Sequence, residues 1–563
     1  MNPLLQISNL SITFRSEGGI VQATKGVSLS ISRGEILALV GESGSGKSVT
    51  SLSILQLLPS PPAEYTSGAI TFTDGEKETN LLGLPTEQRR NIRGNRIAMI
   101  FQEPMTSLNP VMKCGRQVAE AILQHKKVSN TEARRQAVEW FRKVQLPNPE
   151  GMYDRYPHQL SGGQKQRVMI AMAMCCQPAL LICDEPTTAL DVTVQKTILQ
   201  LIKDLQQEQD MGVIFITHDL GVVAEIADRV AIMYKGEIVE QGDTRSIFEH
   251  ARHPYTQALI ACRPALHPKG EKLPVVADFL EGKRTAPIAP RTCETTTESG
   301  DLLVQVKDLS VKFPTRTNLF GKTLAYTTAV DSVSFDIYKG ETLGLVGESG
   351  CGKTTLGRTL LRLTEPSGGQ ILLGSTDITR LSKAELKSFR KDVQLVFQDP
   401  YSSLNPRLTI GDAMEEPMTV TGLLRDKGER KRRVAELLDK VNLSSTSANR
   451  YPHEFSGGQR QRIVIARALA LNPTFLVCDE SVSALDVSVQ AQVLNLLNDL
   501  KKDLGLTLLF ISHDLSVVRY MSDRIMVMHR GRIIESGESE QVYNQPQSEY
   551  TQKLLAAIPK VAV

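Results

Sequence analysis

The sequence predicts an α/β protein built from two copies of one domain, each with a mainly parallel core sheet, an antiparallel β subdomain and a helical subdomain. Two observations predict this organisation. A set of short motifs occurs twice in the same order, with a constant offset of 295 residues over most of its length (456 − 161, 479 − 184 and 513 − 218). Short, continuously apolar runs precede the main motifs, as is typical of strands buried on both faces of a sheet.

The core strands are expected at these apolar runs, which cover residues 36–40, 180–183 and 213–216 in the first copy and 342–346, 475–478 and 508–511 in the second. Alternating runs at 5–10 and 303–309 predict the antiparallel subdomain. In the first copy the apolar period then becomes helical. Ser129 and Glu132 have the spacing of a capping box, and an apolar stripe follows at Ala133, Ala137, Trp140, Phe141 and Val144.

Composition and charge exclude several classes of function. The 563 residues include 65 Lys and Arg against 62 Asp and Glu, and the net charge of +3 gives no reason to expect nucleic acid or a polybasic membrane anchor. Eight cysteines without a C-x-x-C pair are typical of reduced thiols in a cytosolic protein. We expect no signal peptide, and no apolar run approaches the ~18–20 residues that span a bilayer.

The first domain is expected to cover residues 1–263 and the second residues 301–563, each with a C-terminal extension. Tyr-Thr-Gln at 255–257 recurs at 550–552, so the repeated portion extends well past the other motifs. The intervening residues 264–300 are predicted to be an irregular linker because they contain a polar run and several prolines, namely Pro264, Pro268, Pro274, Pro287 and Pro290.

The first repeated motif is a glycine-rich phosphate loop, G-x(4)-G-K-[ST], whose backbone N–H groups and following helix favour a bound phosphate. Lys47 and Lys353 are expected to reach the β- and γ-phosphates, and Ser48 and Thr354 to place a hydroxyl on Mg²⁺. The sequence therefore predicts two P-loop NTPase sites for ATP and Mg²⁺. The loop residues are Gly41, Glu42, Ser43, Gly44, Ser45, Gly46, Lys47 and Ser48, and Gly347, Glu348, Ser349, Gly350, Cys351, Gly352, Lys353 and Thr354.

Two adjacent carboxylates end a later apolar run in each copy. Asp184 and Asp479 would be costly at a buried strand end unless they met a cation, so we expect them to act on Mg²⁺ through water. Glu185 and Glu480 come next and are expected to point to the opposite face, toward the attacking water. We assign these two glutamates as general bases.

Glutamine and histidine side chains follow other strands of the predicted sheets. Gln102 and Gln398 end strand-like runs, where an amide can bind both the metal ion and the water. His218 and His513 are expected to donate a hydrogen bond to the γ-phosphate. A lone residue of either type at a strand end is more often structural, and the repeated context beside a phosphate loop favours a catalytic role.

A second glycine motif contains a hydroxyl and an amide but no lysine. It stands at the expected start of a helix in each copy, which predicts a second anion site. Each phosphate loop therefore has a possible partner in the other half. The residues are Ser161, Gly162, Gly163 and Gln164, and Ser456, Gly457, Gly458 and Gln459.

With these motifs the chain resembles the ATPase subunits of ATP-binding cassette (ABC) transporters, over essentially all of its length apart from the linker. The segments FQEPMTSLNP at 101–110 and FQDPYSSLNP at 397–406, with the Tyr-Thr-Gln tails, make it similar to a fused form of the peptide and nickel importer group. The resemblance implies an ATPase that energises peptide import (glutathione, dipeptides or oligopeptides) in a bacterium.

The resemblance also implies how the sites are completed and what the chain binds. The halves would pair head to tail within one chain, so that each phosphate loop meets the second glycine motif of the other half. Phe14 and Phe313 stand near where the family stacks an aromatic ring on adenine, and Tyr326 competes with Phe313 for this role. Implied partners are two integral-membrane permease subunits and, indirectly, a periplasmic or lipoprotein solute-binding protein. The chain would lie at the cytoplasmic face of the inner membrane, without nucleic acid.

Two features depart from the family's pattern, and the first is expected to have little effect on the chemistry of the ATP sites. Ser481 replaces the proline that Pro186 supplies in the first copy. Cys262 and Cys293 stand apart, so the cysteine cluster with which relatives hold an iron–sulfur centre is missing.

The third departure makes the two phosphate loops chemically unequal. Cys351 replaces the serine found at Ser45, and it lies beside Lys353 at the start of a predicted helix. Both surroundings lower a thiol pKa, so the sequence predicts a reactive Cys351 that a maleimide modifies and bound ATP protects.

Two other functional classes share the duplicated motifs. A soluble twin-ATPase acting on ribosomes would carry a long, highly charged helical linker, whereas the linker here contains prolines. A DNA-repair ATPase would bring zinc-binding cysteine pairs or long coiled coils, and the sequence has neither. Nickel or another non-peptide solute is an alternative cargo, because cargo is selected by subunits outside this chain.

Overall fold

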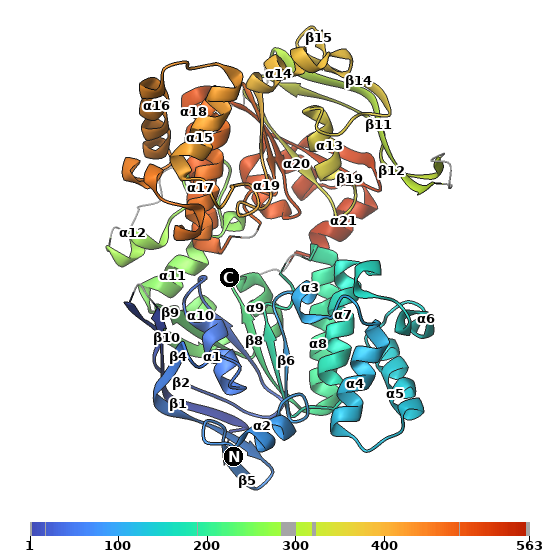
Figure 1. Ribbon diagram of the computed structural model, residues 1–563, viewed down its shortest axis with the longest axis vertical. Helices are drawn as coiled ribbons and strands as arrows, with labels where there is room; N and C mark the ends of the chain where they lie inside the picture. Colours follow the sequence, from blue (N-terminus) through green and yellow to red (C-terminus); the bar gives the residue numbers. More distant parts are fainter. Residues whose placement is uncertain are drawn as a thin grey trace. The chain divides into compact units, whose positions relative to one another are not determined.

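The computed structural model divides into two compact units, Met1–Ile260 and Ala261–Ile558, and each is considered by itself. The structure describes residues 3–16, 19–188, 190–282, 300–317, 323–483 and 485–558. Figure 1 labels the helices and strands by the names used below. Both units are α/β, as the sequence predicts, and each contains a six-stranded and a four-stranded sheet.

The core sheet of unit 1 has the strand order β10-β9-β3-β8-β7-β6. Its neighbours pair in parallel, except that β10 pairs with β9 antiparallel at one edge. Every residue of β3, β7 and β8 is buried, which confirms the core strands expected from the continuous apolar runs. The strands are β3 (Ile36–Val40), β6 (Ile97–Ile100), β7 (Leu180–Asp184), β8 (Gly212–Thr217), β9 (Arg229–Tyr234) and β10 (Glu237–Asp243).

The second sheet of unit 1 is antiparallel, in the order β2-β1-β4-β5. Leu5 and Ile7 of β1 are buried at alternate positions, and a bulge at Asn9 (φ 51°) shifts the register so that Leu10 and Ile12 continue the buried face. The alternating run at 5–10 therefore predicted this strand correctly. The strands are β1 (Leu5–Ser16), β2 (Gly19–Ile31), β4 (Ala63–Asp74) and β5 (Lys77–Asn80).

The helical subdomain of unit 1 is formed by α4 (Cys114–His125), α5 (Asn130–Lys143), α6 (Pro149–Tyr153) and α7 (Gly162–Met174), which lie together in Figure 1. The Ser129 hydroxyl caps α5 by accepting a hydrogen bond from the backbone N–H of Glu132 (3.2 Å). The predicted apolar stripe is buried along its whole length, with Trp140 its most exposed member at 6%. The helical insert is thus confirmed.

The other helices of unit 1 connect the strands or form the C-terminal extension. They are α1 (Lys47–Ile54), α2 (Thr86–Ile92), α3 (Pro104–Ser107), α8 (Val192–Gln209), α9 (Leu220–Ile226), α10 (Thr244–Glu249) and α11 (Pro254–Ala261). Helix α1 follows β3 and α8 follows β7, so both begin at the carboxyl edge of the core sheet.

Unit 2 repeats this architecture, with the strand orders β16-β17-β18-β13-β19-β20 and β12-β11-β14-β15. The core strands are β13 (Thr342–Val346), β16 (Val393–Val396), β17 (Phe475–Asp479), β18 (Thr507–Ile511), β19 (Arg524–His529) and β20 (Arg532–Glu538). The antiparallel sheet consists of β11 (Leu302–Thr317), β12 (Thr323–Tyr338), β14 (Gly368–Leu373) and β15 (Thr376–Asp377). The helices are α13 (Lys353–Leu360), α14 (Lys383–Asp392), α15 (Ile410–Thr421), α16 (Lys427–Lys440), α17 (Gly457–Ala468), α18 (Val487–Leu504), α19 (Leu515–Met521), α20 (Ser539–Asn544) and α21 (Glu549–Ala556).

The first part of the predicted linker is packed within unit 2 rather than irregular. Residues 264–282 contain a 3₁₀ turn at Pro264–Leu266 and helix α12 (Val276–Leu280). Residues 261–282 are called the strap below. Residues 283–299, which include Cys293, lie outside the described residues, and the domain boundaries remain a proposal.

Polar contacts fasten the strap to α18 and α19. The side-chain amide of Asn495 accepts from the backbone N–H of Leu273 (2.9 Å) and donates to its carbonyl oxygen (2.8 Å). The Tyr520 hydroxyl donates to the Glu271 carbonyl oxygen (2.6 Å), and Lys269 forms an ion pair with Asp523. Because Leu273 is only 1% exposed, these hydrogen bonds satisfy backbone groups that water does not reach.

Across the described part of the chain, none of the helices combines the length and the apolar content needed to cross a membrane.

Candidate active site

The phosphate loops connect β3 to α1 and β13 to α13, at the carboxyl edge of each core sheet. Gly46 and Gly352, at the start of each helix, adopt left-handed backbone conformations (φ 104° and 111°). A Cβ on Gly46 would lie 2.6 Å from the carbonyl oxygen of Ala23 in β2. Glycine is therefore required by the backbone conformation and by the close approach of β2 to the loop.

The lysine of each phosphate loop is buried and held by carbonyl oxygens at the entrance of its loop. Lys47 Nζ donates to the oxygens of Gly41 and Glu42, at 2.8 Å each. Lys353 Nζ makes the matching pair of hydrogen bonds in unit 2, at 2.7 and 3.0 Å. The two side chains are 5% and 4% exposed. Both ammonium groups are thus positioned at the phosphate loop.

The predicted Mg²⁺ ligands lie together at the strand ends. Ser48 Oγ lies 3.2 Å from Asp184 Oδ1, and Thr354 Oγ1 lies 3.1 Å from Asp479 Oδ1. Burial raises the pKa of Asp184 to about 6 and also raises the pKa of Asp479. A bound Mg²⁺ would stabilise the ionised form of each buried aspartate, and carboxylate and hydroxyl oxygens are hard ligands that this ion prefers. These residues therefore fit Mg²⁺.

The other predicted catalytic side chains of unit 1 contact the Glu185 carboxylate. Its Oε2 accepts hydrogen bonds from Gln102 Nε2 (3.2 Å) and the Thr188 hydroxyl (3.0 Å), and it lies 3.3 Å from His218 Nδ1. Glu185 also adopts a left-handed φ of 46°, which is unusual outside glycine and is found at functional sites. Gln102 is therefore positioned on the proposed general base, rather than on the Ser48–Asp184 pair.

Ionisation of the glutamate and the histidine is coupled. Burial opposes the charge on Glu185, but the hydrogen bond and the charge of His218 outweigh it and lower the Glu185 pKa. Burial would likewise lower the His218 pKa, but the contact with Glu185 raises it. Glu185 is thus ionised at neutral pH, as a general base must be, and His218 is held with its Nδ1 on that carboxylate.

Unit 2 places Gln398 and His513 on Glu480 in the same way, at 2.7 Å (Nε2) and 3.6 Å (Nδ1) from its Oε2. Glu480 has the same φ of 46°, so Ser481 in place of Pro186 leaves this conformation unchanged. The units differ at the next hydroxyl, because Ser483 donates to the Glu480 carbonyl oxygen (2.9 Å) rather than to the carboxylate.

The second glycine motif begins α7 in unit 1 and α17 in unit 2. The Ser161 hydroxyl accepts from the backbone N–H of Gln164 (3.4 Å), whose side-chain oxygen accepts from the Ser161 N–H (3.1 Å), and Ser456 and Gln459 form the same capping box. A Cβ on Gly163 would lie 2.7 Å from the Val194 side chain, whereas one on Gly162 would make an ordinary contact. The second glycine is thus needed for packing.

Gly457 and Gly458 repeat this difference in unit 2. A Cβ on Gly458 would collide with Val489, whereas a Cβ on Gly457 would meet nothing within 4 Å. The first glycine of the motif therefore stands at an open helix start.

The residues proposed to contact adenine lie in the antiparallel sheets. Phe14 of β1 is half-buried and stands opposite Val21 of β2, two residues before the point where β2 meets the phosphate loop. Phe313 and Tyr326 are 43% and 61% exposed on β11 and β12. Both remain candidates for the adenine contact in unit 2.

The structure overturns the predicted reactivity of Cys351. The thiol is buried, and this burial raises its pKa although Lys353 and the helix start act in the opposite direction. The sequence showed the two influences that lower the thiol pKa, namely Lys353 and the helix start. It did not show that the loop packs against the turn between β19 and β20, where the Cys351 carbonyl oxygen accepts a hydrogen bond from the Gly531 N–H (2.9 Å). The prediction of a lowered pKa was therefore wrong.

Tyr255 and Tyr550 reach the phosphate loops, a role that the sequence did not predict. The Tyr255 hydroxyl accepts a hydrogen bond from the backbone N–H of Glu42 (3.0 Å), and Tyr550 does the same for Glu348 (3.1 Å). The signal was present, since Tyr-Thr-Gln recurs outside the other motifs, but nothing local indicated what the ring would touch.

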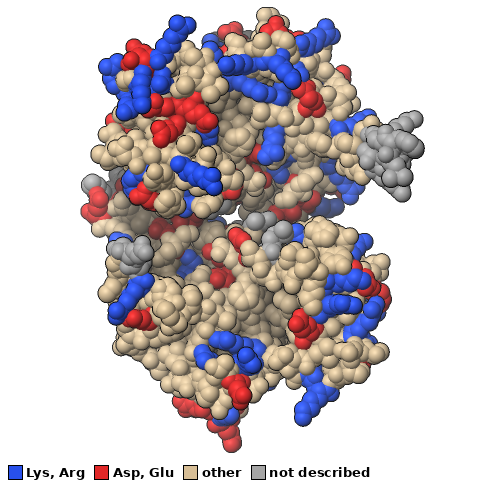
Figure 2. Space-filling view, viewed as in Figure 1, with Lys and Arg blue, Asp and Glu red and all other residues tan. Residues whose placement is uncertain are grey.

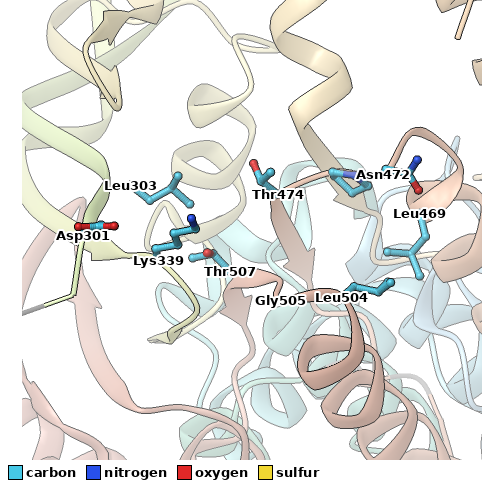
Figure 3. A pocket seen from close by; sticks show the side chains of 10 residues that line it. Asp301, Leu303, Lys339, Leu469, Asn472, Thr474, Leu504, Gly505 and Thr507 are labelled. Atoms are coloured by element: carbon cyan, nitrogen blue, oxygen red, sulfur yellow. The ribbon is translucent and has the colours of Figure 1, made fainter. Parts of the chain in front are cut away.

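Other surface features lie away from these groups. A cavity of about 450 Å³ in unit 2 is shown in Figure 3. It lies beside the amino-terminal ends of β17 and β18, whereas the phosphate loop of this unit follows the carboxyl end of β13. It is lined by Asp301, Leu303, Lys339, Leu469, Asn472, Pro473, Thr474, Leu504, Gly505 and Thr507. On the face drawn in Figure 2, basic and acidic side chains are interspersed on both units.

Comparisons with known proteins identify the family of the chain. A family model described as ABC transporter matches residues 24–188 and 330–483, and one described as oligopeptide/dipeptide transporter, C-terminal region, matches residues 239–288 and 534–563. The chain therefore belongs to the ABC transporter family and is an ATPase with two cassettes.

Named relatives are similar over nearly the whole chain. The glutathione import ATP-binding proteins of Salmonella choleraesuis (strain SC-B67) and Escherichia coli (strain K12) are 50% and 51% identical to it over 558 residues, which is 99% of this chain and 89% of each relative. A solved dimeric structure of a bacterial ABC transporter cassette is 29% identical, covers 42% of this chain and 99% of its own, and has a TM-score of 0.38.

Proposed function

We propose that this chain hydrolyses ATP to energise peptide import, with glutathione, dipeptides and oligopeptides as candidate cargo, at the cytoplasmic face of a bacterial inner membrane. The observation that carries the proposal is the oligopeptide/dipeptide transporter region in both halves. Similarity at 50–51% identity to relatives named for glutathione import supports the cargo class.

In the proposed reaction, Lys47 and Lys353 bind the β- and γ-phosphates of ATP. Ser48 with Asp184 and Thr354 with Asp479 would hold Mg²⁺, which would supply positive charge to the phosphates. The backbone N–H groups of the loop residues and the start of each following helix contribute further donors.

The proton of the attacking water is accepted by Glu185 in the first site. The Gln102 amide orients the Glu185 carboxylate through its Oε2, while His218 keeps it ionised and offers its second ring nitrogen to the γ-phosphate. Glu480, Gln398 and His513 take the same roles in the second site. Both sites are proposed to be hydrolytic because each has the full set of these groups.

We further propose that the two halves pair head to tail within the chain. The open helix starts at Gly162 and Gly457 support this pairing, because each offers backbone N–H groups to the γ-phosphate bound by the other half. The residues involved are Ser161 to Gln164 for the site of Lys353 and Ser456 to Gln459 for the site of Lys47.

Two permease subunits are the proposed membrane partners, with a solute-binding protein delivering cargo to them. The contacts with the permeases are assigned to the segments after Gln102 and Gln398. Asn109 and Asn405 are exposed there, and Arg467 holds the Ser403 carbonyl oxygen (2.8 Å). Changes in these segments are expected to uncouple transport while the isolated ATPase is largely kept.

Uptake by whole cells tests the proposal. The gene for this chain is deleted, and uptake of labelled glutathione, a dipeptide and Ni²⁺ is measured after complementation with the wild type or with Glu185→Gln/Glu480→Gln. Loss of peptide uptake that only the wild type restores is the expected result. Loss of Ni²⁺ uptake alone would assign a non-peptide cargo, and unchanged uptake with co-purifying ribosomes or DNA would favour the other classes.

A further inference from the structure

The first peptide group of each phosphate loop is fixed by two hydrogen bonds, one accepted by its carbonyl oxygen and one donated by its N–H group. In unit 1 this is the peptide that joins Gly41 to Glu42. Its carbonyl oxygen accepts from Lys47 Nζ (2.8 Å), and its N–H donates to the Tyr255 hydroxyl (3.0 Å). Because a peptide group is planar, fixing its N–H also fixes the direction of its carbonyl oxygen.

The same arrangement exists in unit 2. The peptide between Gly347 and Glu348 accepts from Lys353 Nζ (2.7 Å) and donates to the Tyr550 hydroxyl (3.1 Å). Burial raises the pKa of Tyr550, so the hydroxyl stays neutral and available as an acceptor over the working pH range. The repetition of this geometry in two independent units argues against an incidental contact.

Each tyrosine lies in a helix of the C-terminal extension, α11 or α21, which contacts with the last two strands of the core sheet hold in place. Tyr255 of α11 is 0% exposed and stacks on Tyr234 at the end of β9, with ring centroids 4.2 Å apart. Glu240 of β10 anchors the start of α11 by accepting from the backbone N–H groups of Arg252 (2.8 Å) and His253 (3.1 Å). The hydroxyl position is therefore set by α11 and its contacts with β9 and β10 rather than by the loop.

The extension of unit 2 uses equivalent contacts. Tyr550 of α21 stacks on His529 of β19, with ring centroids 4.1 Å apart. Glu535 accepts from the backbone N–H groups of Gln547 (2.7 Å) and Ser548 (3.1 Å) before α21 begins. In both units, the tyrosine, its stacking partner and the anchoring glutamate therefore form the same arrangement beside the phosphate loop.

We propose that Tyr255 and Tyr550 are positioning residues for the ATP sites, through which each C-terminal extension fixes the first peptide of its phosphate loop and the lysine bound to it. Without the hydroxyl, this peptide can rotate, so that one of the two carbonyl acceptors of the lysine is no longer fixed. Nucleotide binding must then order the loop, and the cost of ordering appears as weaker binding. The chemistry at Glu185 and Glu480, which the tyrosines do not touch, is unaffected.

The test uses Tyr255→Phe, Tyr550→Phe and the double variant in the full chain. Since one hydrogen bond contributes about 0.5–1.5 kcal/mol, each site is expected to lose about two- to tenfold in affinity. We expect the KM for ATP and the Kd of a fluorescent ATP analogue to rise by this factor, with kcat within about twofold of the wild type. The double variant should show the shift at both sites.

Tyr234→Phe is the matched control, because it keeps the ring that stacks on Tyr255 and removes a hydroxyl that has no hydrogen bond to the loop among the described residues. It is expected to leave KM unchanged. Glu240→Gln weakens the anchor of α11 without touching the loop, and it should shift KM in the same direction by less. Melting temperatures verify that the variants fold.

Two results would overturn the proposal. One is an unchanged KM and Kd in both Tyr255→Phe and Tyr550→Phe. The other is a lowered melting temperature or kcat with normal nucleotide affinity, which would mean that the tyrosines only stabilise the extension.

Discussion

The two units share most contacts of their ATP sites but differ on the faces of α8 and α9 in unit 1 and of α18 and α19 in unit 2. Ser48 to Asp184 and Thr354 to Asp479 are separated by 3.2 and 3.1 Å, and both general bases adopt a φ of 46°. In contrast, Asn495 of α18 is buried beneath the strap, whereas its counterpart Gln200 of α8 is exposed.

Tyr520 of α19 and its counterpart Glu225 of α9 differ in the same way, because Tyr520 is 1% exposed and Glu225 lies in solvent. The comparison shows that two sites with the same chemistry keep the same geometry at the strand ends. On the helix faces, the residue types instead depend on which segment packs against them. Unit 2 has the buried Asn495 and Tyr520 at these positions, where the strap packs on the helices.

The largest expected effect tests whether the sites are equal in turnover. Glu185→Gln and Glu480→Gln each remove a proposed general base, which is worth roughly 10²–10⁴ in rate. Each is expected to lower the ATPase activity of the assembled transporter by well over tenfold. Glu249→Gln, which changes an α10 carboxylate paired with Arg245, serves as the control. Near-normal activity of one catalytic variant would show that its site is degenerate.

The difference between the helix faces is tested by removing the amides. Asn495→Ala leaves a buried N–H and carbonyl of Leu273 without their partner, which costs about 2–3 kcal/mol. Hydrogen exchange of the strap amides is expected to speed up accordingly. Gln200→Ala, at the exposed counterpart, should change local stability by no more than about 0.5 kcal/mol. Equal effects of the two substitutions would mean that the strap is not held by Asn495.

Acid should weaken the attachment of the strap in unit 2. Burial opposes the charge on Asp523, but Lys501 and Lys269 outweigh it and hold the Asp523 pKa below its ordinary value. A carboxylate of this kind stabilises the fold above its unfolded pKa of about 3.9, and this stability is lost as the pH falls through the lower folded pKa.

Protection of the strap amides is therefore expected to be constant between about pH 7 and 5 and to decrease below about pH 4. Because the pair is partly exposed, the change should not exceed about 1 kcal/mol. Asp523→Asn should flatten the profile, and an unaltered acid response in this variant would assign the effect to other groups.

The smallest expected effect concerns the two phosphate loops. Since burial raises the Cys351 pKa, maleimide labelling of this residue at pH 7 should be several-fold slower in the native than in the unfolded protein. Cys351→Ser makes the loop resemble that of unit 1 and should change ATPase activity by less than about twofold. Mass spectrometry of the labelled peptide gives the rate, and rapid labelling blocked by ATP would restore the expectation from sequence.

Local patterns in the sequence determined most of the fold and the candidate site. Continuous apolar runs predicted the core strands, because a strand that is buried on both faces has no solvent-exposed position for a polar side chain. The spacing of Ser129, Glu132 and the apolar stripe predicted α5, and the glycine loops predicted where Lys47 and Lys353 would lie. These features depend on neighbours within a few residues, so they can be read along the chain.

The tertiary structure decided what depends on distant neighbours. Tyr255 meets the N–H of Glu42 across 213 residues, and Asn495 meets Leu273 across 222 residues. No local pattern encodes such pairs, because they form only when the fold brings distant segments of the chain together. The Cys351 pKa was misjudged for the same reason: the charges that lower it are local, whereas the burial that raises it belongs to the fold.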